Sequence, residues 1–223
     1  MEDIDAIAAL QDPVRRRLYE YVAAQGREVG RNEAAEATGV ARTLAAHHLD
    51  RLAEAGLLET GSRRLTGRSG PGAGRPAKVY ARARTERSVS LPARDYRTAA
   101  ELLAEAAEEA GLDAGLGAAA HRRGEALRAA AGPCRDLAEA LEVLAARGYE
   151  PYPERARTAD REVLRMRNCP FHAVAENFPP LVCGMNLALL EGLLGADGPL
   201  RARMDARPGE CCVVVEDSKN NVD

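Results

Sequence analysis

Aromatic residues are scarce in this chain of 223 residues, at 4% with no tryptophan, so a core must be built largely from Ala, Leu and Val. No segment approaches the roughly 18 unbroken apolar residues that a membrane span requires. The first residues, MEDIDAIAALQDPVRRR, carry acids where a signal peptide needs positive charge. These absences predict a cytoplasmic protein with no membrane partner.

The residue composition indicates a folded protein whose charge is unevenly distributed along the chain. Hydrophobic residues make up 46% and charged residues 29%, which is enough to bury a core, and the length favours two small domains. The formal net charge is only -3, yet residues 61 to 90 hold eight Arg or Lys residues against the single acid Glu86. One basic segment in an acidic protein indicates a contact with a polyanion.

Three helices are predicted before residue 57. Asp12 stands in an N-cap position before Pro13, and the helix that follows should end near Gly26. A short helix should end at Gly39 and a longer one at Gly56, which is the helix-turn-helix arrangement. The inward stripe of the longer helix is predicted to hold Leu44 or Ala45, His48, Leu49 and Leu52, with His48 as a hydrogen-bonded core residue.

Two strands, 57–60 and 77–83, should follow, with a Gly-, Pro- and Arg-rich loop between them. This layout predicts a winged helix, in which one helix enters the major groove and cationic loops contact phosphate or the minor groove. The alternative for the loop is a stretch of charged residues that is exposed to solvent and has no binding role. The residues predicted to face bases are Arg42, Thr43, Ala46 and His47. Those predicted to contact phosphate or the minor groove are Arg51, Arg63, Arg64, Arg68, Arg75 and Lys78.

Three stretches of this first part, DPVRRRLYEYV, HHLDRLAEAGLLE and GRPAKVY, resemble the winged-helix domain of ArsR-like bacterial repressors over roughly residues 5 to 86. The resemblance implies the fold and DNA binding, and it does not specify the signal. We therefore expect a winged-helix domain at residues 1–90.

The segment 91–112 is predicted to be a linker and dimerisation helix. Its helical part, 95–111, has Ala99, Leu102, Leu103, Ala106 and Ala110 on one face and acids on the other. Such a stripe suits internal packing or the seam of a homodimer, and the sequence does not separate the two.

Residues 113–223 are predicted to form an α+β sensor domain that contains the cysteines. Helices are expected at 118–131, 136–147 and 180–194, and strands at 149–153, 162–167 and 210–216. The sequence has no nucleotide-binding Gly-rich loop, nucleophile elbow or paired carboxylates, so the protein is not expected to be an enzyme.

The five cysteines are better interpreted as thiols or metal ligands than as disulfides in a reducing compartment. Cys169, Cys183 and the pair Cys211 and Cys212 are too widely spaced for a zinc finger, and this spacing suits a site assembled from separate elements. Thiolates are soft ligands that favour zinc, copper(I) and iron-sulfur clusters. The alternative for any one cysteine is a small buried hydrophobe, and Cys134 is assigned to that role.

The stretches NCPFHAVAE, LVCGMNLALLEGLL and PGECCVVVE together resemble the C-terminal domain of SufR-type regulators, which are winged-helix repressors that sense iron-sulfur status. The resemblance implies cluster ligands at Cys169, Cys183 and a cysteine of the last strand. Strand alternation puts only one of the adjacent pair inside and favours Cys211 over Cys212. A 4Fe-4S cluster is favoured, and 2Fe-2S with His172 as the fourth ligand stays open.

The predicted function is that of a transcriptional repressor. A homodimer would bind a palindromic double-stranded operator while an iron-sulfur cluster is present. The alternative is a regulator that uses the same thiolates for zinc, a heavy metal or haem.

Overall fold

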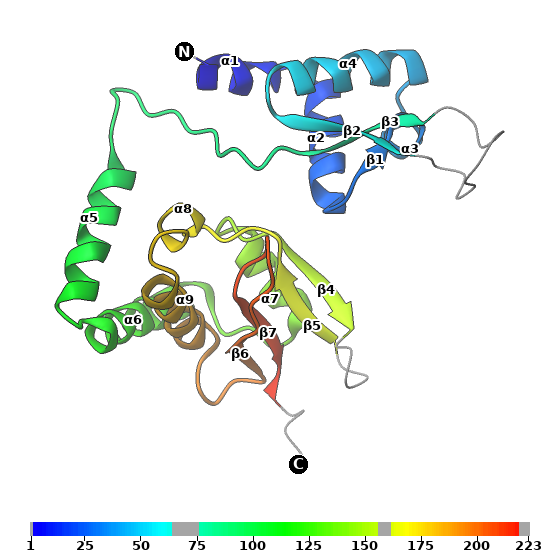
Figure 1. The fold of residues 1–223 in the computed structure, drawn as a ribbon. Coiled ribbons are helices and arrows are strands. Elements are labelled where there is room, and N and C mark those ends of the chain that lie inside the picture. Colours follow the sequence, from blue (N-terminus) through cyan, green and yellow to red (C-terminus); the bar gives the residue numbers. More distant parts are fainter. Residues whose placement is uncertain (1, 64–75, 156–161, 219–223) are drawn as a thin grey trace. The chain divides into compact units, whose positions relative to one another are not determined.

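The structure of the protein, a computed structural model, describes residues 2–63, 76–155 and 162–218. The chain divides into two compact units, Met1–Arg94 and Asp95–Asp223 (Figure 1). No helix in the described ranges is both long enough and apolar enough to cross a membrane.

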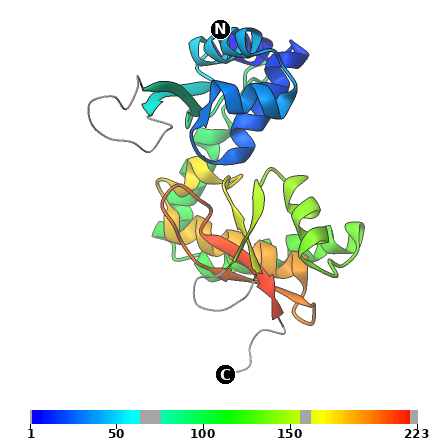
Figure 2. The ribbon, with the colours of Figure 1, turned by 90° about the vertical axis from the view of Figure 1, so that its right-hand side faces the viewer.

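The first unit is a set of four helices and a small antiparallel sheet (Figures 1 and 2). Its helices are α1 (Glu2–Ala9), α2 (Pro13–Gln25), α3 (Arg31–Thr38) and α4 (Arg42–Glu54). Its strands are β1 (Val29–Gly30), β2 (Leu58–Arg63) and β3 (Ala77–Arg82), in the spatial order β1-β3-β2. Two strands that follow a helix-turn-helix and pair with each other describe a winged helix, as the sequence predicts.

Local chemistry accounts for where these helices begin and end. The Asp12 side chain accepts hydrogen bonds from the backbone N–H groups of Val14 and Arg15, at 2.8 and 3.0 Å, which caps α2. At the other end Gly26 adopts φ 62°, a left-handed conformation that suits glycine. The turn between α3 and α4 uses Gly39 in the same way, at φ 67°.

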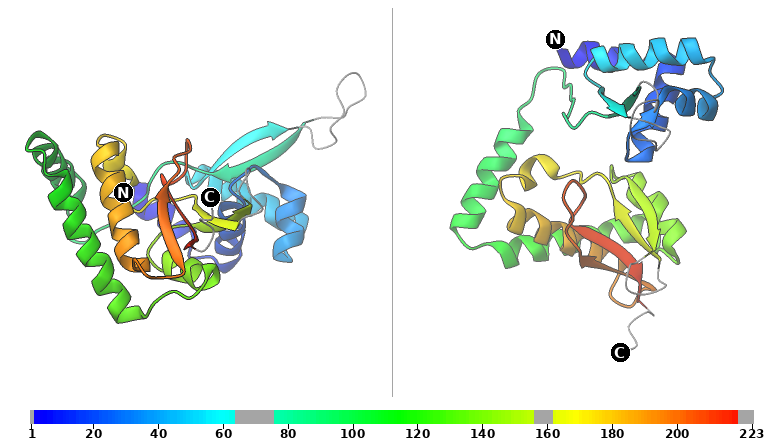
Figure 3. Two further views of the ribbon diagram at one scale, coloured as in Figure 1. Left: turned by 90° about the horizontal axis from the view of Figure 1, so that it is seen from below. Right: turned by 45° about the vertical axis from the view of Figure 1, so that its right-hand side comes forward.

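The second unit packs helices against one antiparallel sheet. Its helices are α5 (Tyr96–Glu109), α6 (Asp113–Ala131), α7 (Leu137–Ala145), α8 (His172–Ala175) and α9 (Pro179–Leu194). Its strands are β4 (Pro151–Arg155), β5 (Glu162–Met166), β6 (Leu200–Met204) and β7 (Val213–Asp217), in the spatial order β4-β5-β7-β6. The long helices α6 and α9 lie side by side (Figure 3).

The two faces of this sheet differ in chemistry because side chains alternate along each strand. One face carries Leu164, Met166, Val213 and Val215, which join residues of α7 and α9 in the core. On the other face, the Arg165 side chain is 2% exposed and donates to carboxylates of Glu154 at 2.8 Å and Asp205 at 2.6 Å. A continuous ion-pair network therefore covers the side of the sheet opposite the core.

Several elements differ from the sequence-based expectation. Helix α1 and strand β6 were not predicted, although Leu200, Ala202 and Met204 alternate with arginines as a strand should. Helix α6 begins five residues earlier than expected, at Asp113. Strand β7 begins at Val213, after both adjacent cysteines, because Cys211 and Cys212 lie in the turn that leads into it.

Candidate functional site: a helix-turn-helix and a thiol site

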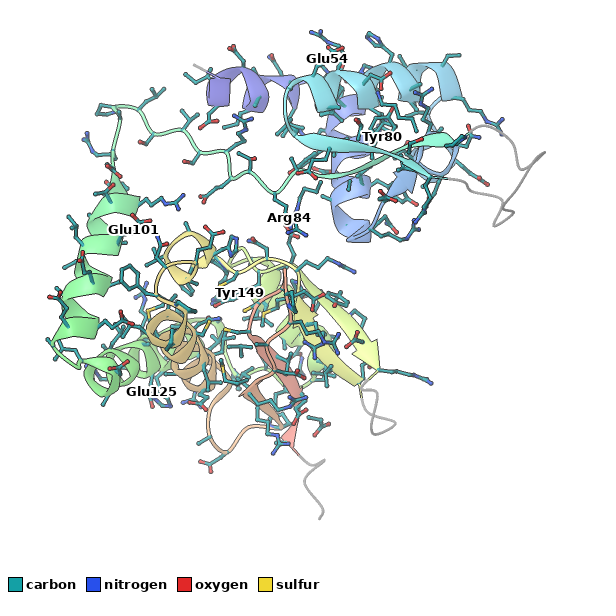
Figure 4. The ribbon with its side chains drawn as sticks, in the orientation of Figure 1. Glu54, Tyr80, Arg84, Glu101, Glu125 and Tyr149 are labelled. Atoms are coloured by element: carbon teal, nitrogen blue, oxygen red, sulfur yellow. The ribbon has the colours of Figure 1, made fainter. Side chains whose placement is uncertain are left out.

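Helix α4 presents the residues predicted to face bases on its exposed side. Arg42, Thr43 and His47 are exposed and Ala46 is half-buried. The opposite side of α4 is buried, and its inward members are Ala45, His48, Leu49 and Leu52. Ala45 therefore occupies the inward position for which the sequence left Leu44 as an alternative. Figure 4 labels Glu54, the last residue of this helix.

His48 is buried as predicted, with 9% of its surface exposed. The expected hydrogen bond is missing at one ring nitrogen, since Nδ1 has no partner among the described residues. Burial lowers the pKa of His48 because a charged imidazole would lose its hydration. The His48 ring is therefore neutral and packed on the buried side of α4. His47 is the histidine of this helix that faces outward.

The described residues among those predicted to contact phosphate pair with acids of their own unit. Arg51 pairs with Glu54 at 2.9 Å, and Arg63 lies 3.6 Å from Glu28. These pairs are largely exposed, and exposed ion pairs contribute little stability, so phosphate can replace the carboxylate. Residues Arg64, Arg68 and Arg75 lie outside the described part of the chain.

Lys78 makes a closer ion pair than Arg51 or Arg63. Its Nζ lies 2.6 Å from Oδ1 of Asp50, and the same oxygen accepts the hydroxyl of Tyr80 at 2.6 Å. Tyr80 is fully buried, and burial together with Asp50 raises its pKa to about 12. This contact joins α4 to β3, so Lys78 fixes the helix against the wing strands (Figure 4, where Tyr80 is labelled).

In the second unit, four of the five cysteines come together from three separate segments. Cys169 lies in the turn between β5 and α8, Cys183 lies in α9, and Cys211 and Cys212 directly precede β7. Cys211 lies next to Cys169 and Cys212, and Cys212 also lies next to Cys183. We call these four residues the thiol site.

Cys211 is the centre of this arrangement. Its sulfur lies next to the thiol donors of Cys169 and Cys212 and accepts a hydrogen bond from Nδ2 of Asn186 at 3.3 Å. These donors lower the pKa of Cys211, although its burial works in the opposite direction. The pKa values of Cys169 and Cys212 are raised by their contact with Cys211 and by burial. Cys211 is therefore the thiol of the site that is best prepared to become a thiolate.

Two buried polar residues support the thiol site, and the sequence analysis did not identify them. Tyr149 donates its hydroxyl to Oδ1 of Asn186 at 2.6 Å, which fixes the amide so that Nδ2 points to Cys211. Tyr149 is 3% exposed and Asn186 is fully buried (Figure 4, where Tyr149 is labelled). A lone Asn in the apolar run LVCGMNLALLEGLL was the available signal, since a buried amide requires partners.

The expectation that only one of the adjacent cysteines could face the site is wrong, because neither lies in the strand whose alternation it assumed. The imidazole of His172 is turned to solvent, although its backbone N–H donates to the carbonyl of Cys169. His172 begins α8, its side chain is 64% exposed, and its Nε2 lies 3.3 Å from Oε1 of Glu176. Cys134 is buried in the core, where burial raises its pKa, in keeping with its assigned role as a small hydrophobe.

The four thiols of the site influence one another. Cys211 lies next to Cys169 and Cys212, Cys212 lies next to Cys183, and Cys169 is also near enough to Cys183 for their charges to interact. Across the described residues, no group of three or more His, Cys, Asp or Glu side chains is arranged around the position of a single metal ion.

A family model described as a helix-turn-helix domain matches residues 10–61. No curated protein and no protein of solved structure shows a significant match to the chain. The matched segment runs from the loop before α2 into β2, so it covers α2, α3 and α4 and the first part of one wing strand. Fold and match together support a DNA-binding transcriptional regulator with an N-terminal winged helix.

Proposed function

We propose that this regulator is a repressor whose operator binding is controlled by an iron-sulfur cluster held at the thiol site. The observation that carries the proposal is the meeting of Cys169, Cys183, Cys211 and Cys212 from three segments of the unit that follows the DNA-binding unit. The resemblance to SufR-type regulators adds support. Four thiols supply a complete ligand set, so His172 is not needed as a ligand.

The donor chemistry of the site fits such a group. Thiolates are the usual ligands of iron-sulfur clusters, and hydrogen bonds to their sulfurs tune the bound group. Cys211 receives a hydrogen bond from Nδ2 of Asn186. A cluster of this kind, when bound, would supply sensitivity to iron supply and to oxidants.

Zinc is the competing occupant, because four cysteines also form a tetrahedral zinc set. With zinc-sulfur bonds of about 2.3 Å, all four sulfurs must converge on one point. Among the described residues no three ligand side chains are arranged around the position of a single metal ion, which favours a group with several metal atoms that distributes its ligands over a larger volume.

Ligation would act on the protein by joining segments that are otherwise held by weak contacts. Cys183 belongs to α9, Cys169 precedes α8, and the adjacent cysteines precede β7. Thiol hydrogen bonds are weak, so the apo form can exchange among several arrangements of these segments. Metal-sulfur bonds made in one arrangement stabilise that arrangement alone, which is what a ligand must do to shift an equilibrium.

The test begins with anaerobic purification of the full chain, followed by absorption spectra and assays of iron, acid-labile sulfide and zinc. The operator is selected from random duplex DNA, and its affinity is measured with the loaded and the apo protein. We expect a brown protein that binds the operator more tightly when loaded. Cysteine-to-serine changes at positions 169, 183, 211 and 212 should each reduce bound iron.

Two matched variants serve as controls. Cys134→Ser removes a thiol outside the site, and His172→Ala removes the imidazole, so both should keep iron and colour. A colourless anaerobic protein with full operator affinity would contradict the proposal. If the protein contained one equivalent of zinc and no sulfide, zinc and not a cluster would be the occupant of the thiol site. A Soret band in the spectrum would identify the occupant as haem.

A further inference from the structure

The loop that joins β6 to β7, residues 205–212, ends in the adjacent cysteines of the thiol site (Figure 1). The backbone N–H of Cys211 donates to the carbonyl of Met166, the last residue of β5, at 2.9 Å. Met166 stands three residues before Cys169. This bond therefore holds the end of the loop beside the segment that carries another thiol of the site.

The charged side chains of the loop are tied to the neighbouring strands β4 and β5. These side chains are Asp205, Arg207 and Glu210. The carboxylate of Asp205 accepts from Arg165 of β5 at 2.6 Å, and Arg207 donates to Glu154 of β4 at 2.9 Å. The carboxylate of Glu210 accepts the hydroxyl of Tyr152 of β4 at 2.6 Å. The ion-pair network on this side of the sheet thus also fastens the loop.

Arg165 is the first of two anchors of the loop. Its side chain is 2% exposed, and its three guanidinium nitrogens all have partners. Nε donates to Glu154 at 2.8 Å, Nη2 to the carboxylate of Asp205 at 2.6 Å, and Nη1 to the carbonyl of Asp205 at 3.2 Å. A buried guanidinium adds little net stability because desolvation offsets its attraction, but its planar donors fix the direction of each partner. Arg165 therefore fixes where the loop begins.

Tyr152 is the second anchor, at the other end of the loop. Its hydroxyl holds Glu210, which directly precedes Cys211. The guanidinium carbon of Arg167 lies over its ring, 3.9 Å from the ring centre, and Arg167 stands two residues before Cys169. One side chain therefore contacts both segments that lead into the paired thiols.

We propose that Arg165 and Tyr152 are positioning residues of the thiol site, which hold loop 205–212 so that Cys211 and Cys212 lie among the other thiols before any ligand binds. Without these anchors the loop would open locally more often, because fewer bonds would oppose its opening. Ligands that are already in place lose less conformational freedom when they bind, so the anchors favour loading of the site. This last step rests on the proposed function.

The competing explanation is that the anchors only stabilise the sheet as a whole. Two buried cysteines separate the explanations. Cys211, at the end of the loop, is 2% exposed, and Cys134, outside the thiol site, is 4% exposed. Local opening of the loop gives a reagent access to Cys211 alone, whereas general destabilisation gives access to both residues.

The experiment measures the alkylation rate of each cysteine by mass spectrometry, with iodoacetamide and the reduced full-length apo protein at pH 7. We expect Arg165→Met to raise the rate at Cys211 about tenfold and to leave the rate at Cys134 within about twofold of wild type. Tyr152→Phe removes only a hydroxyl, so the rate at Cys211 should rise by a smaller factor, about threefold. If Arg165→Met did not fold, Tyr152→Phe would decide the question alone.

Arg201→Met is the matched control for the loss of a cation from the same side of the sheet. Arg201 pairs with Glu216 of β7 and lies at the start of β6, whereas the loop follows the end of that strand. This variant should leave the alkylation rates of Cys211 and Cys134 unchanged. Equal increases at the two cysteines in Arg165→Met, or no increase at Cys211 in either anchor variant, would overturn the proposal.

Anaerobically prepared protein tests the link to the thiol site. We expect Arg165→Met to lose bound iron to a chelator about tenfold faster than Arg201→Met, because residues that orient ligands affect how firmly a metal is held. Equal rates of iron loss would overturn the role in loading. The two proposals fail separately. A wild type without iron contradicts the proposed function, and the alkylation of the apo protein still decides whether Arg165 and Tyr152 position the loop.

Discussion

The contact between α6 and α9 depends on two glycines that face each other across the helix pair. A side-chain carbon added at Gly124 would lie 2.6 Å from the backbone nitrogen of Leu193 and closer still to the carbonyl oxygen of Leu189. One added at Gly192 would lie 2.9 Å from the carbonyl carbon of His121. Both obstacles are backbone atoms, so no side chain can turn away to make room.

The size of the effect of Gly124→Ala follows from these distances. Heavy atoms pack at about 3.5 Å or more, so the helices must separate by about 1 Å. Overpacking of this kind costs about 1–3 kcal/mol, and a rigid backbone on the opposite side places this case at about 3 kcal/mol. Alanine recovers about 1 kcal/mol through its better helix propensity. We expect a net loss of about 2 kcal/mol in the unfolding free energy.

Urea denaturation of the full chain, followed by circular dichroism, measures this loss, and hydrogen exchange of α6 and α9 localises it. Gly115→Ala in the same helix is the matched control, because an added carbon there meets nothing within 4 Å. That control should be neutral or stabilised by up to about 1 kcal/mol. If Gly124→Ala proved as stable as Gly115→Ala, the proposed backbone contact between the two helices would be refuted.

Two further predictions concern the charged face of the sheet and the DNA-reading helix. Arg165→Met should cost about 2 kcal/mol at pH 7, because the half-buried carboxylates of Glu154 and Asp205 lose the charged hydrogen bonds of a buried guanidinium and keep only Arg207 and Arg203. Arg207 and Arg165 hold the pKa of Glu154 low, so that carboxylate stabilises the fold above its unfolded pKa and loses this effect as pH falls. The cost of Arg165→Met, measured by urea denaturation, should therefore shrink toward pH 4, and a cost independent of pH would contradict this origin. Arg42→Ala should weaken operator binding about 10- to 100-fold with little change in unfolding free energy, whereas Arg135→Ala in the second unit should change neither, as titrations with labelled operator would show. Equal operator affinity of Arg42→Ala and wild type would remove Arg42 from the interface.

The winged helix was predictable because its signals are local. Asp12, Gly26 and Gly39 mark helix ends through capping and left-handed φ values that few other residues satisfy. The inward and outward sides of α4 follow from helical periodicity, and only the choice between Leu44 and Ala45 required the structure. The ion pair of Lys78 was not predictable, since its partner Asp50 lies 28 residues away in the sequence.

The sequence predicted which cysteines meet at the thiol site, but it did not predict how they are arranged. Wide spacing and soft ligand chemistry selected cysteines that the structure brings together, but strand alternation predicted that only one of Cys211 and Cys212 would face the site. The error arose from a boundary, because the strand begins at Val213 and sequence patterns locate strand ends poorly. The Tyr149 and Asn186 contact joins residues 37 apart, and only the packed core brings them together.

Helix α9 connects these observations, because one element carries residues with three different tasks. Gly192 holds it against α6, Asn186 donates to Cys211, and Cys183 contacts Cys212. A separation of α6 and α9 by about 1 Å is comparable to the tolerance of a hydrogen bond, so Gly124→Ala should also disturb the donor to Cys211. The variant then links stability and sensing in a single measurement. Its anaerobic iron content should fall relative to that of Gly115→Ala, and unchanged iron in a destabilised variant would show that the thiol site tolerates movement of the helix that supports it.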